Sequence, residues 1–330
     1  GKWHLGSRDE QHPNNRGFDL FYGMKAGGRD YFYNEKKSDR PGDERNLLLN
    51  DRQVKFEKYL TDAFSEKAVE FINESSQPFM MYLAYNAVHT PMQATDEDMA
   101  KFEGHPRQKL AAMTYALDRG VGTVIRGLKD SGKFDNTLIF FLSDNGGATT
   151  NQSSNYPLKG FKGNKFEGGH RVPYFVVWKN GIPAGKPYDG LVSSLDIFAT
   201  AIDAASISKT RNRLDGVSLL PYLKGKKGEP HKVLYWRKMD TRAIRSGDYK
   251  LIITHGVDSV LYNIRRDPEE MNNLINKEPD LYRKLAKKLA KWEKNECIEP
   301  SWLEEGWRKI TNRYHQQLMH NEIKTAQDLY

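Results

Sequence analysis

The sequence predicts an α/β protein whose main sheet is mostly parallel and doubly wound, followed by a small antiparallel sheet with helices. Short apolar runs at 79–83, in TLIFFL and at 174–178 are typical of strands buried on both faces, and stretches of helical periodicity lie between them. This alternation favours a parallel sheet with helices on its faces. After about Pro221 apolar and polar residues alternate, which favours an antiparallel sheet with one face in water.

The elements follow one another in a simple order. A stretch rich in Gly, Asn, Asp and Arg, residues 7–58, predicts long loops with short ordered pieces. The antiparallel strands are expected in HKVLYWR, TRAIRSGDYKLIIT and SVLYNIRRDPEE, with SGD as a turn. We predict an α/β domain over 1–222 and an α+β subdomain over 223–330. Apolar spacing predicts helices at 59–74, 107–131, 193–205, 279–295 and, more weakly, 296–330.

The composition, 38% hydrophobic and 28% charged over 330 residues, is typical of a globular protein. No apolar run reaches the roughly 18 residues that a membrane helix needs, and no nucleic-acid recognition motif occurs, so we expect neither partner. The net charge of +8 indicates either a solvated basic surface or an anionic partner such as a sulfated polymer. The single cysteine, Cys297, excludes an intrachain disulfide and a cysteine-built metal site.

Two polar side chains follow TLIFFL directly, in the sequence SDNGG. Asp144 and Asn145 offer oxygen ligands at the end of a strand, and such ligands suit a hard cation such as calcium or magnesium. Gly146 and Gly147 allow the backbone to turn sharply there. An Asx-type turn that only closes the strand accounts for the same residues, so both interpretations stay open at this point.

The stretch KGFKGNKFEGGHRVP alternates lysines with glycines. Lys159, Lys162 and Lys165 are point charges for an oxyanion, and glycine lets the backbone approach a ligand closely. A mobile, solvated loop is the alternative interpretation. The stretch is not a Walker loop, because GxxxxGK[ST] is absent.

His89, in NAVHTP, follows the predicted strand 79–83. In a parallel sheet it shares an edge with Asp144, where a histidine could act as a general acid near neutral pH. A hydrogen-bonded structural histidine is the alternative. The sequence contains no GxSxG elbow and no HExxH motif, and no basic cluster adjoins Cys297. The residues therefore indicate a hard metal, lysines, a histidine and an anionic substrate, without an evident nucleophile.

Seven motifs, in their order and spacing, resemble the type I sulfatases of the alkaline phosphatase superfamily over roughly residues 1–275: GKWHLG, HPNNRGFDLFYG, AYNAVHTPMQA, FLSDNGG, KGNKFEGGHRVP, RSGDYKLI and LYNIRRDPEEMNNL. The resemblance implies an alkaline-phosphatase-like α/β sandwich with a smaller C-terminal antiparallel subdomain. It also implies hydrolysis of a sulfuric ester, with calcium and a formylglycine nucleophile.

The resemblance assigns the metal side of the site first. It implies that Asp144 and Asn145 are two oxygen ligands of an active-site calcium ion. It implies that Lys2 links the nucleophile to the oxyanions on the metal side, and that His4 hydrogen-bonds the hydrated nucleophile. Because Lys2 and His4 lie two residues apart, an extended segment would present both to the same side.

The resemblance also assigns the residues around the sulfate. It implies that His89 and Lys162 hold the sulfate and assist the departing alcohol. Lys162 is the matching lysine because it stands five residues before Glu167 in KGNKFEGG. We expect Glu167 and Arg171 to shape this loop through an ion pair.

Two departures from the family pattern lead to further expectations. The C/S-x-P-x-R motif that yields formylglycine, and the aspartate pair that completes the calcium site, are absent from the 330 residues. We therefore expect a chain that begins inside a sulfatase, or a decayed relative, with exposed apolar faces and no turnover in isolation. In GGRDYF, Arg29 precedes Asp30 where many relatives have a histidine beside an aspartate, so Arg29 is expected to contact the sugar or sulfate.

The leading functional hypothesis is a sulfatase domain acting on a sulfated small molecule or glycan. The alternatives are a phosphonate or phosphate ester hydrolase of the same superfamily, and a non-catalytic binder of sulfated glycan. By analogy with the family we expect a periplasmic, secreted or lysosomal location.

Overall fold

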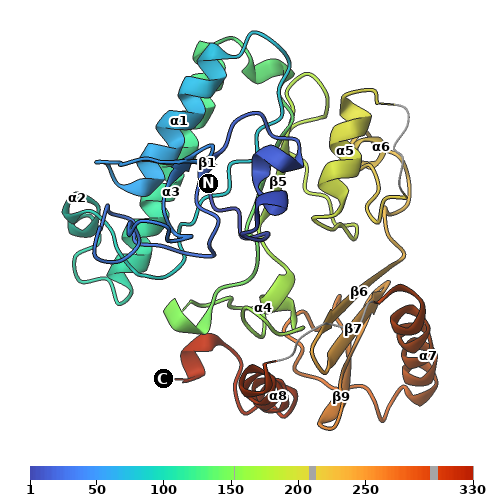
Figure 1. Ribbon diagram of the computed structural model, residues 1–330. Helices are drawn as coiled ribbons and strands as arrows, with labels where there is room; N and C mark the ends of the chain where they lie inside the picture. Colours follow the sequence, from blue (N-terminus) through green and yellow to red (C-terminus); the bar gives the residue numbers. More distant parts are fainter. Residues whose placement is uncertain (152, 208–212, 298–303, 330) are drawn as a thin grey trace. The chain divides into compact units, whose positions relative to one another are not determined.

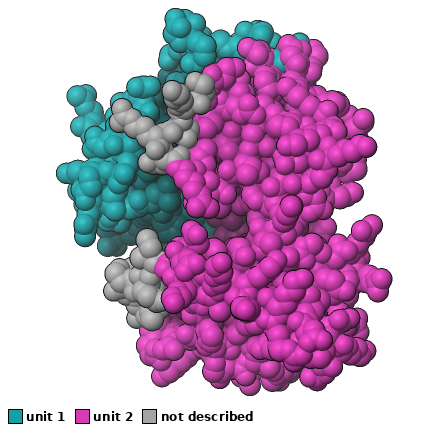
Figure 2. Space-filling view, turned by 90° about the vertical axis from the view of Figure 1, so that its right-hand side faces the viewer, with its two compact units in different colours: residues 1–135 teal, residues 136–330 magenta. Residues whose placement is uncertain are grey.

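The chain folds into two compact units, residues 1–135 and 136–330. The structure is a computed structural model that describes residues 1–151, 153–207, 213–297 and 304–329 (Figure 1). The two units are coloured teal and magenta in Figure 2. The domain boundary expected between residues 222 and 223 falls inside the second unit and stays a prediction.

The first unit combines loops and short strands with a pair of packed helices. Its three-stranded antiparallel sheet has the order β1-β2-β3, and α1 packs along α3. A side chain at Gly120 of α3 would place its Cβ 2.6 Å from Ser65 Oγ of α1, so glycine allows this close approach. The elements are η1 (Asp9–Gln11), η2 (Pro13–Arg16), β1 (Tyr22–Gly23), β2 (Leu48–Leu49), β3 (Arg52–Gln53), α1 (Leu60–Glu74), α2 (Asp96–Ala100) and α3 (Gln108–Asp130).

The helices at 59–74 and 107–131 are confirmed within a residue at each end by α1 and α3. Their buried side chains recur at helical spacing, as Leu60, Phe64, Ala68 and Ile72 do in α1. The apolar periodicity of the sequence was therefore a sufficient signal for both helices.

The first strands of the second unit pair differently from the prediction. After η3 (Phe134–Asn136), β4 (Ile139–Leu142) and β5 (Tyr174–Val177) run antiparallel, whereas the apolar runs had predicted parallel neighbours. A parallel pair needs a crossover of a dozen or more residues that is usually helical, and the segment between β4 and β5 holds only η4 (Thr149–Asn151) and α4 (Glu167–His170). Among the described residues, 79–83 belongs to no strand.

Several apolar side chains of the segments predicted as buried strands are exposed. Phe141 of β4 is 39% exposed and Phe175 of β5 is 59% exposed, and in the first unit Met80 is 67% exposed. Strands of this composition were predicted to be buried on both faces, and in the described chain they are covered incompletely.

The C-terminal sheet of the second unit is antiparallel throughout, in the order β6-β7-β8-β9. The predicted turn joins β7 to β8, with Gly247 at a φ of 56°. The remaining elements are α5 (Asp196–Ala204), α6 (Leu220–Leu223), β6 (Val233–Lys238), β7 (Thr241–Ser246), β8 (Tyr249–Thr254), β9 (Asp258–Asn263), α7 (Pro279–Glu296), α8 (Glu305–Met319) and η5 (Ala326–Leu329).

The expectation of one wet face on this sheet is wrong, because helices cover both faces (Figure 1). Ile244, Leu251 and Leu261 pack against α7. Their strand neighbours point the other way and pack against Leu318 and Met319 of α8 and against Phe161 and Phe166. The segment 296–330, which was weakly predicted to be helical, includes α8, the helix that covers this second face. Residues 298–303 of the segment lie outside the described part of the chain.

In the described ranges no helix is both long and apolar enough to cross a bilayer.

Candidate active site

In the first unit, backbone hydrogen bonds position the N-terminal segment. The N–H of Lys2 donates to Ala84 O at 2.7 Å, and the N–H groups of Trp3 and His4 donate to Met24 O at 2.9 Å and Lys25 O at 3.0 Å. Trp3 is half-buried, and its indole donates to Gln11 O at 2.9 Å. His4 has a φ of 54°, so the extended backbone ends there. The alternation of side chains that would place Lys2 and His4 on the same side of an extended segment therefore does not reach His4.

Two consecutive glycines bring His4 and His89 to adjacent positions. A Cβ on Gly27 would lie 2.6 Å from both Cε1 and Nε2 of His4, and a Cβ on Gly28 would lie 3.3 Å from His89 Nδ1. Only glycine leaves room for the His4 imidazole at position 27. The first unit thus places two of the predicted catalytic histidines against neighbouring residues of one loop.

Hydrogen bonds fix both the backbone and the ring of His89. Tyr31 Oη donates to Asn86 O at 2.7 Å and to His89 O at 2.9 Å, while His89 Nδ1 lies 2.8 Å from Thr90 O. A carbonyl beside Nδ1 favours the tautomer with its proton on Nδ1. Nε2 is then the nitrogen that can accept or deliver a proton.

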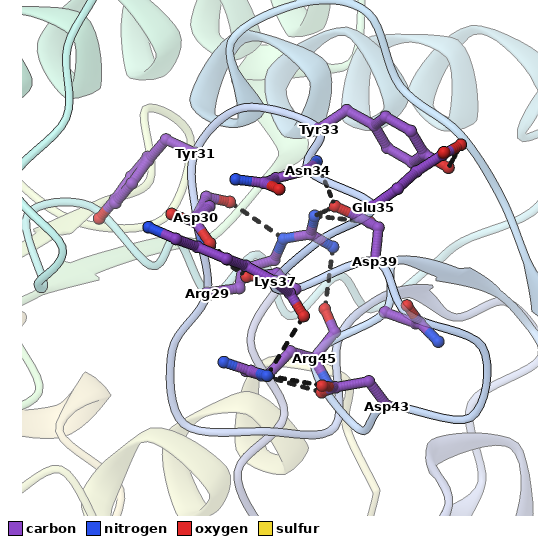
Figure 3. Close-up of polar contacts among 12 residues, drawn as sticks. Arg29, Asp30, Tyr31, Tyr33, Asn34, Glu35, Lys37, Asp39, Asp43 and Arg45 are labelled. Atoms are coloured by element: carbon purple, nitrogen blue, oxygen red, sulfur yellow. Dashed lines mark hydrogen bonds and ion pairs between the residues drawn. The ribbon is translucent and has the colours of Figure 1, made fainter.

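Arg29 belongs to a buried network of hydrogen bonds within the first unit, and its expected contact with substrate stays a prediction (Figure 3). Its guanidinium makes two 2.8 Å bonds to the Asp39 carboxylate and donates to the carbonyls of Asp30 and Arg45. The Arg29 and Asp39 side chains are both 0% exposed, and the Arg29 guanidinium lies 4.7 Å from the Phe56 ring centroid. Each of its three side-chain nitrogens therefore donates at least one hydrogen bond within the first unit.

In the second unit, Asp144 and Asn145 lie in the loop after β4. Asp144 is exposed, and among the described residues its carboxylate accepts no hydrogen bond and forms no ion pair. Asn145 is half-buried and donates its side-chain N–H to Gly146 O at 2.9 Å, so its side-chain oxygen is left as a candidate ligand. An unpaired carboxylate beside an amide oxygen fits half of a calcium site.

The lysine loop is bonded directly to this acidic loop. The N–H of Lys162 donates to Gly147 O at 2.9 Å, and the N–H of Gly146 donates to Gly169 O at 3.1 Å. A Cβ on Gly146 would lie 1.8 Å from Gly168 O, so the two loops meet backbone to backbone. Lys162 is exposed. The structure therefore brings Asp144, Asn145 and Lys162 together.

A buried ionic cluster holds the lysine loop on the C-terminal sheet. Lys250 of β8, 0% exposed, bonds Glu167 Oε1 at 2.8 Å and Glu270 Oε1 at 2.9 Å. Although burial opposes ionisation, Lys250 and other nearby cations lower the pKa of Glu167 to about 2, while desolvation raises the pKa of Glu270 to about 7. The predicted ion pair between Glu167 and Arg171 is present at 3.6 Å, but Lys250 is the closer partner.

Three residues that contact this loop, Lys250, Glu270 and Lys238, were not predicted from the sequence. Glu270 follows Glu167 by 103 residues, and Lys238 ends β6 as an ordinary polar residue of a strand. Spacing along the sequence does not predict these contacts, because they depend on the register in which the strands of the C-terminal sheet pair.

No complete metal site lies within the described part of the chain, where no three His, Cys, Asp or Glu side chains form a cluster suited to a metal ion. The oxygens of Asp144 and Asn145 can supply only part of a calcium coordination shell, which takes six to eight oxygens.

Comparisons with known proteins identify the family of this chain. A family model described as Sulfatase matches residues 1–207, and one described as N-sulphoglucosamine sulphohydrolase, C-terminal, matches residues 162–295. The chain is 38% identical over 240 residues to the uncharacterized sulfatase YdeN of Escherichia coli (strain K12), covering 70% of this chain and 41% of YdeN. It is 31% identical over 265 residues to the N-acetylgalactosamine-6-sulfatase of Canis lupus familiaris, covering 76% of this chain and 50% of that protein.

A solved structure agrees as well. The crystal structure of Ps i-CgsB in complex with k-i-k-neocarrahexaose matches with a TM-score of 0.84 at 36% identity, over 96% of this chain and 77% of that chain. The predicted alkaline-phosphatase-like α/β fold class is thereby confirmed. The chain spans half or less of the length of the two curated relatives. With the Sulfatase model matching well over half of its residues, this chain belongs to the sulfatase family.

Proposed function

We propose that the protein containing this chain hydrolyses a sulfate ester of a carbohydrate. The observation that carries the proposal is the direct bonding of the Asp144–Asn145 loop to the Lys162 loop, through Lys162 N–H and Gly147 O at 2.9 Å. This contact places an unpaired carboxylate, an amide oxygen and an exposed ammonium group in one region of the second unit. Such a set suits a hard cation and the oxyanion that the cation would bind.

Asp144 and Asn145 would hold calcium through their side-chain oxygens. Bound calcium supplies Lewis-acid stabilisation of the sulfuryl oxygens. Lys162 adds a fixed positive charge for the same oxygens, and each preorganised contact of this kind is worth about 3 kcal/mol in kcat.

In the first unit, His89 in its imidazolium form would protonate the departing alcohol oxygen from Nε2 and keep the Nδ1 proton, which Thr90 O holds at 2.8 Å. Lys2 and His4 would face the nucleophile, with His4 positioned by the backbone of Gly27. We include Lys2, His4, His89 and Lys162 in the catalytic set, and Arg29 is left out because its side-chain nitrogens donate hydrogen bonds within the first unit.

The nucleophile is the part that this chain does not provide. We propose that it is a formylglycine made from a C/S-x-P-x-R motif outside these 330 residues, in which the motif does not occur. The 330-residue chain by itself is then expected to release no sulfate. Its relatives include an N-acetylgalactosamine-6-sulfatase and a protein solved in complex with a neocarrahexaose, and both support a carbohydrate substrate. We expect the protein to act in the periplasm, in a lysosome or outside the cell.

Hydrolysis assays of the protein encoded by the complete reading frame test the proposal. We expect release of inorganic sulfate from sulfated oligosaccharides, and a higher kcat/KM on an aryl sulfate than on the matching aryl phosphate or phosphonate. Preference for the phosphorus ester would favour the alternative hydrolase, and a reading frame without Cys or Ser in the motif would exclude catalysis.

A further inference from the structure

A second lysine from the C-terminal sheet reaches the Lys162 loop. A Cβ on Gly163 would lie 2.8 Å from Nζ of Lys238, the last residue of β6. Gly163 has a φ of 96° and follows Lys162 directly. The ammonium group of Lys238 therefore lies against the loop at Gly163, which directly follows Lys162 and precedes Lys165 by two residues.

These lysines have no counter-charge in the part of the chain that the structure describes. Neither Lys165 nor Lys238 forms an ion pair or side-chain hydrogen bond there, although both are half-buried. Burial lowers the pKa of Lys165 to about 8, and the charges that add to this effect, Lys238 and Lys250, are cations. Burial and Lys162 likewise lower the pKa of Lys238.

Two other buried lysines of the same unit, in contrast, have hydrogen-bond or ion-pair partners. Lys250 has two carboxylate partners within 2.9 Å, and Lys159 donates to Glu270 O at 3.0 Å and to Asn321 Oδ1. An uncompensated buried charge is costly, so proteins retain one chiefly where a ligand or a functional role requires it.

A buried imidazole beside the lysines also lacks a partner. His315 of α8 is 0% exposed, and its Nδ1 lies 2.8 Å from Thr311 O, whereas its Nε2 has no hydrogen-bond partner. Burial, with Lys165 and Lys238, lowers the pKa of His315 to about 4. His315 is therefore neutral near pH 7, and an arriving anion would favour its protonation and create a further donor.

We propose that Lys165 and Lys238 form a second anion-binding site beside Lys162, which takes a second sulfate group of a multiply sulfated carbohydrate. The inference rests on the proposed function in that Lys162 holds the sulfate that is cleaved. A tetrahedral oxyanion would supply the counter-charge that the described residues do not provide, and lysines bind such groups as point charges. The site would make a neighbouring sulfate on the sugar a determinant of affinity.

Equilibrium binding to the 330-residue chain tests the site without requiring turnover. Sucrose octasulfate serves as the multiply sulfated probe and inorganic sulfate as the single anion, each measured by calorimetry at several salt concentrations. The variants are Lys165→Gln, Lys238→Gln and their combination. The matched control is Lys232→Gln, at an exposed lysine that directly precedes the first residue of β6.

We expect about a tenfold loss of sucrose octasulfate affinity for each site lysine removed, since a charged hydrogen bond is worth that much, and a shallower salt dependence. The control should change affinity less than about twofold. The ligand-free variants should unfold at the same temperature as the unaltered chain or higher, because an uncompensated charge is removed. Equal affinities for the double variant and the control, or no saturable binding by the unaltered chain, would overturn the proposal. Failure of sulfate release by the complete protein would leave these binding results standing.

Discussion

At the scale of single residues, two cations expected in one site have opposite surroundings. Arg29 is enclosed by Asp39 and by backbone carbonyls, whereas Lys162 is exposed and has no acid partner in the described chain. Burial with complete hydrogen bonding marks a structural role, and exposure beside an unpaired carboxylate marks a candidate for ligand binding. Sequence alone could not separate them, because the Asp39 partner lies ten residues away within a loop.

Replacing Arg29 tests its structural role. Arg29→Met leaves the Asp39 carboxylate buried without its partner, which should lower the free energy of unfolding by about 3–5 kcal/mol. Arg16→Met, at an exposed arginine, should change it by less than about 0.5 kcal/mol. Denaturant unfolding of both variants measures the difference, and equal stabilities would contradict the structural assignment.

The proposed role of Asp144 as a calcium ligand predicts that its replacement lowers calcium affinity. In the complete protein, Asp144→Ala should weaken calcium binding about tenfold or more, because a carboxylate ligand of the ion is lost. The metal-free fold should be unaffected, since this carboxylate is exposed and has no partner in the described structure. Asp189→Ala, at another exposed aspartate, is the matched control in a calcium titration. Identical affinities in the two variants would rule out Asp144 as a ligand.

At the scale of elements, the lysine loop depends on β8 for its position. Lys250→Met leaves Glu167 and Glu270 facing each other without a cation, so the loop should detach locally before the sheet unfolds. Hydrogen exchange should show faster amide exchange at 159–171 in this variant, with the β6–β9 ladder still protected. Unchanged exchange in the loop would show that the ionic cluster does not hold it.

The pKa of Lys165 predicts a stability change with pH. The unfolded chain keeps this proton up to the ordinary lysine pKa of 10.5, whereas the folded protein releases it near 8. Between these values the unfolded state binds more protons, so raising the pH should stabilise the fold, by at most about 1.4 kcal/mol per pH unit for this group. Lys165→Gln should remove that increment. Unfolding curves at pH 8 and pH 10 measure it, and an identical pH dependence in the variant would contradict the assigned burial.

How far the sequence predicts the elements depends on the range of the interactions involved. Local apolar periodicity placed α1 and α3 within a residue. Pairing direction is a long-range property, and the antiparallel β4–β5 pair was missed for that reason. The coverage of both faces of the C-terminal sheet was missed as well, because it depends on Leu318 and Met319 of a helix that begins over forty residues beyond β9.

At the scale of the whole molecule, the proposed catalytic set is divided between the two units. Lys2, His4 and His89 belong to the first unit, and Asp144, Asn145 and Lys162 belong to the second. Motif order predicted the members of each group. Motif order did not predict how these residues are packed. Gly27 and Gly28 lie against the two imidazoles, and Gly146 lies against Gly168. The only sign of these contacts in the sequence is the glycines themselves.

The central claim is that this chain carries residues that catalyse sulfate release, and kinetic assays of single variants of the complete protein test it most directly. His89→Ala and Lys162→Ala should each lower kcat/KM about a hundredfold. Lys232→Ala is the control and should match the unaltered protein. Values of kcat/KM for His89→Ala and Lys162→Ala within about threefold of the unaltered enzyme would contradict the account.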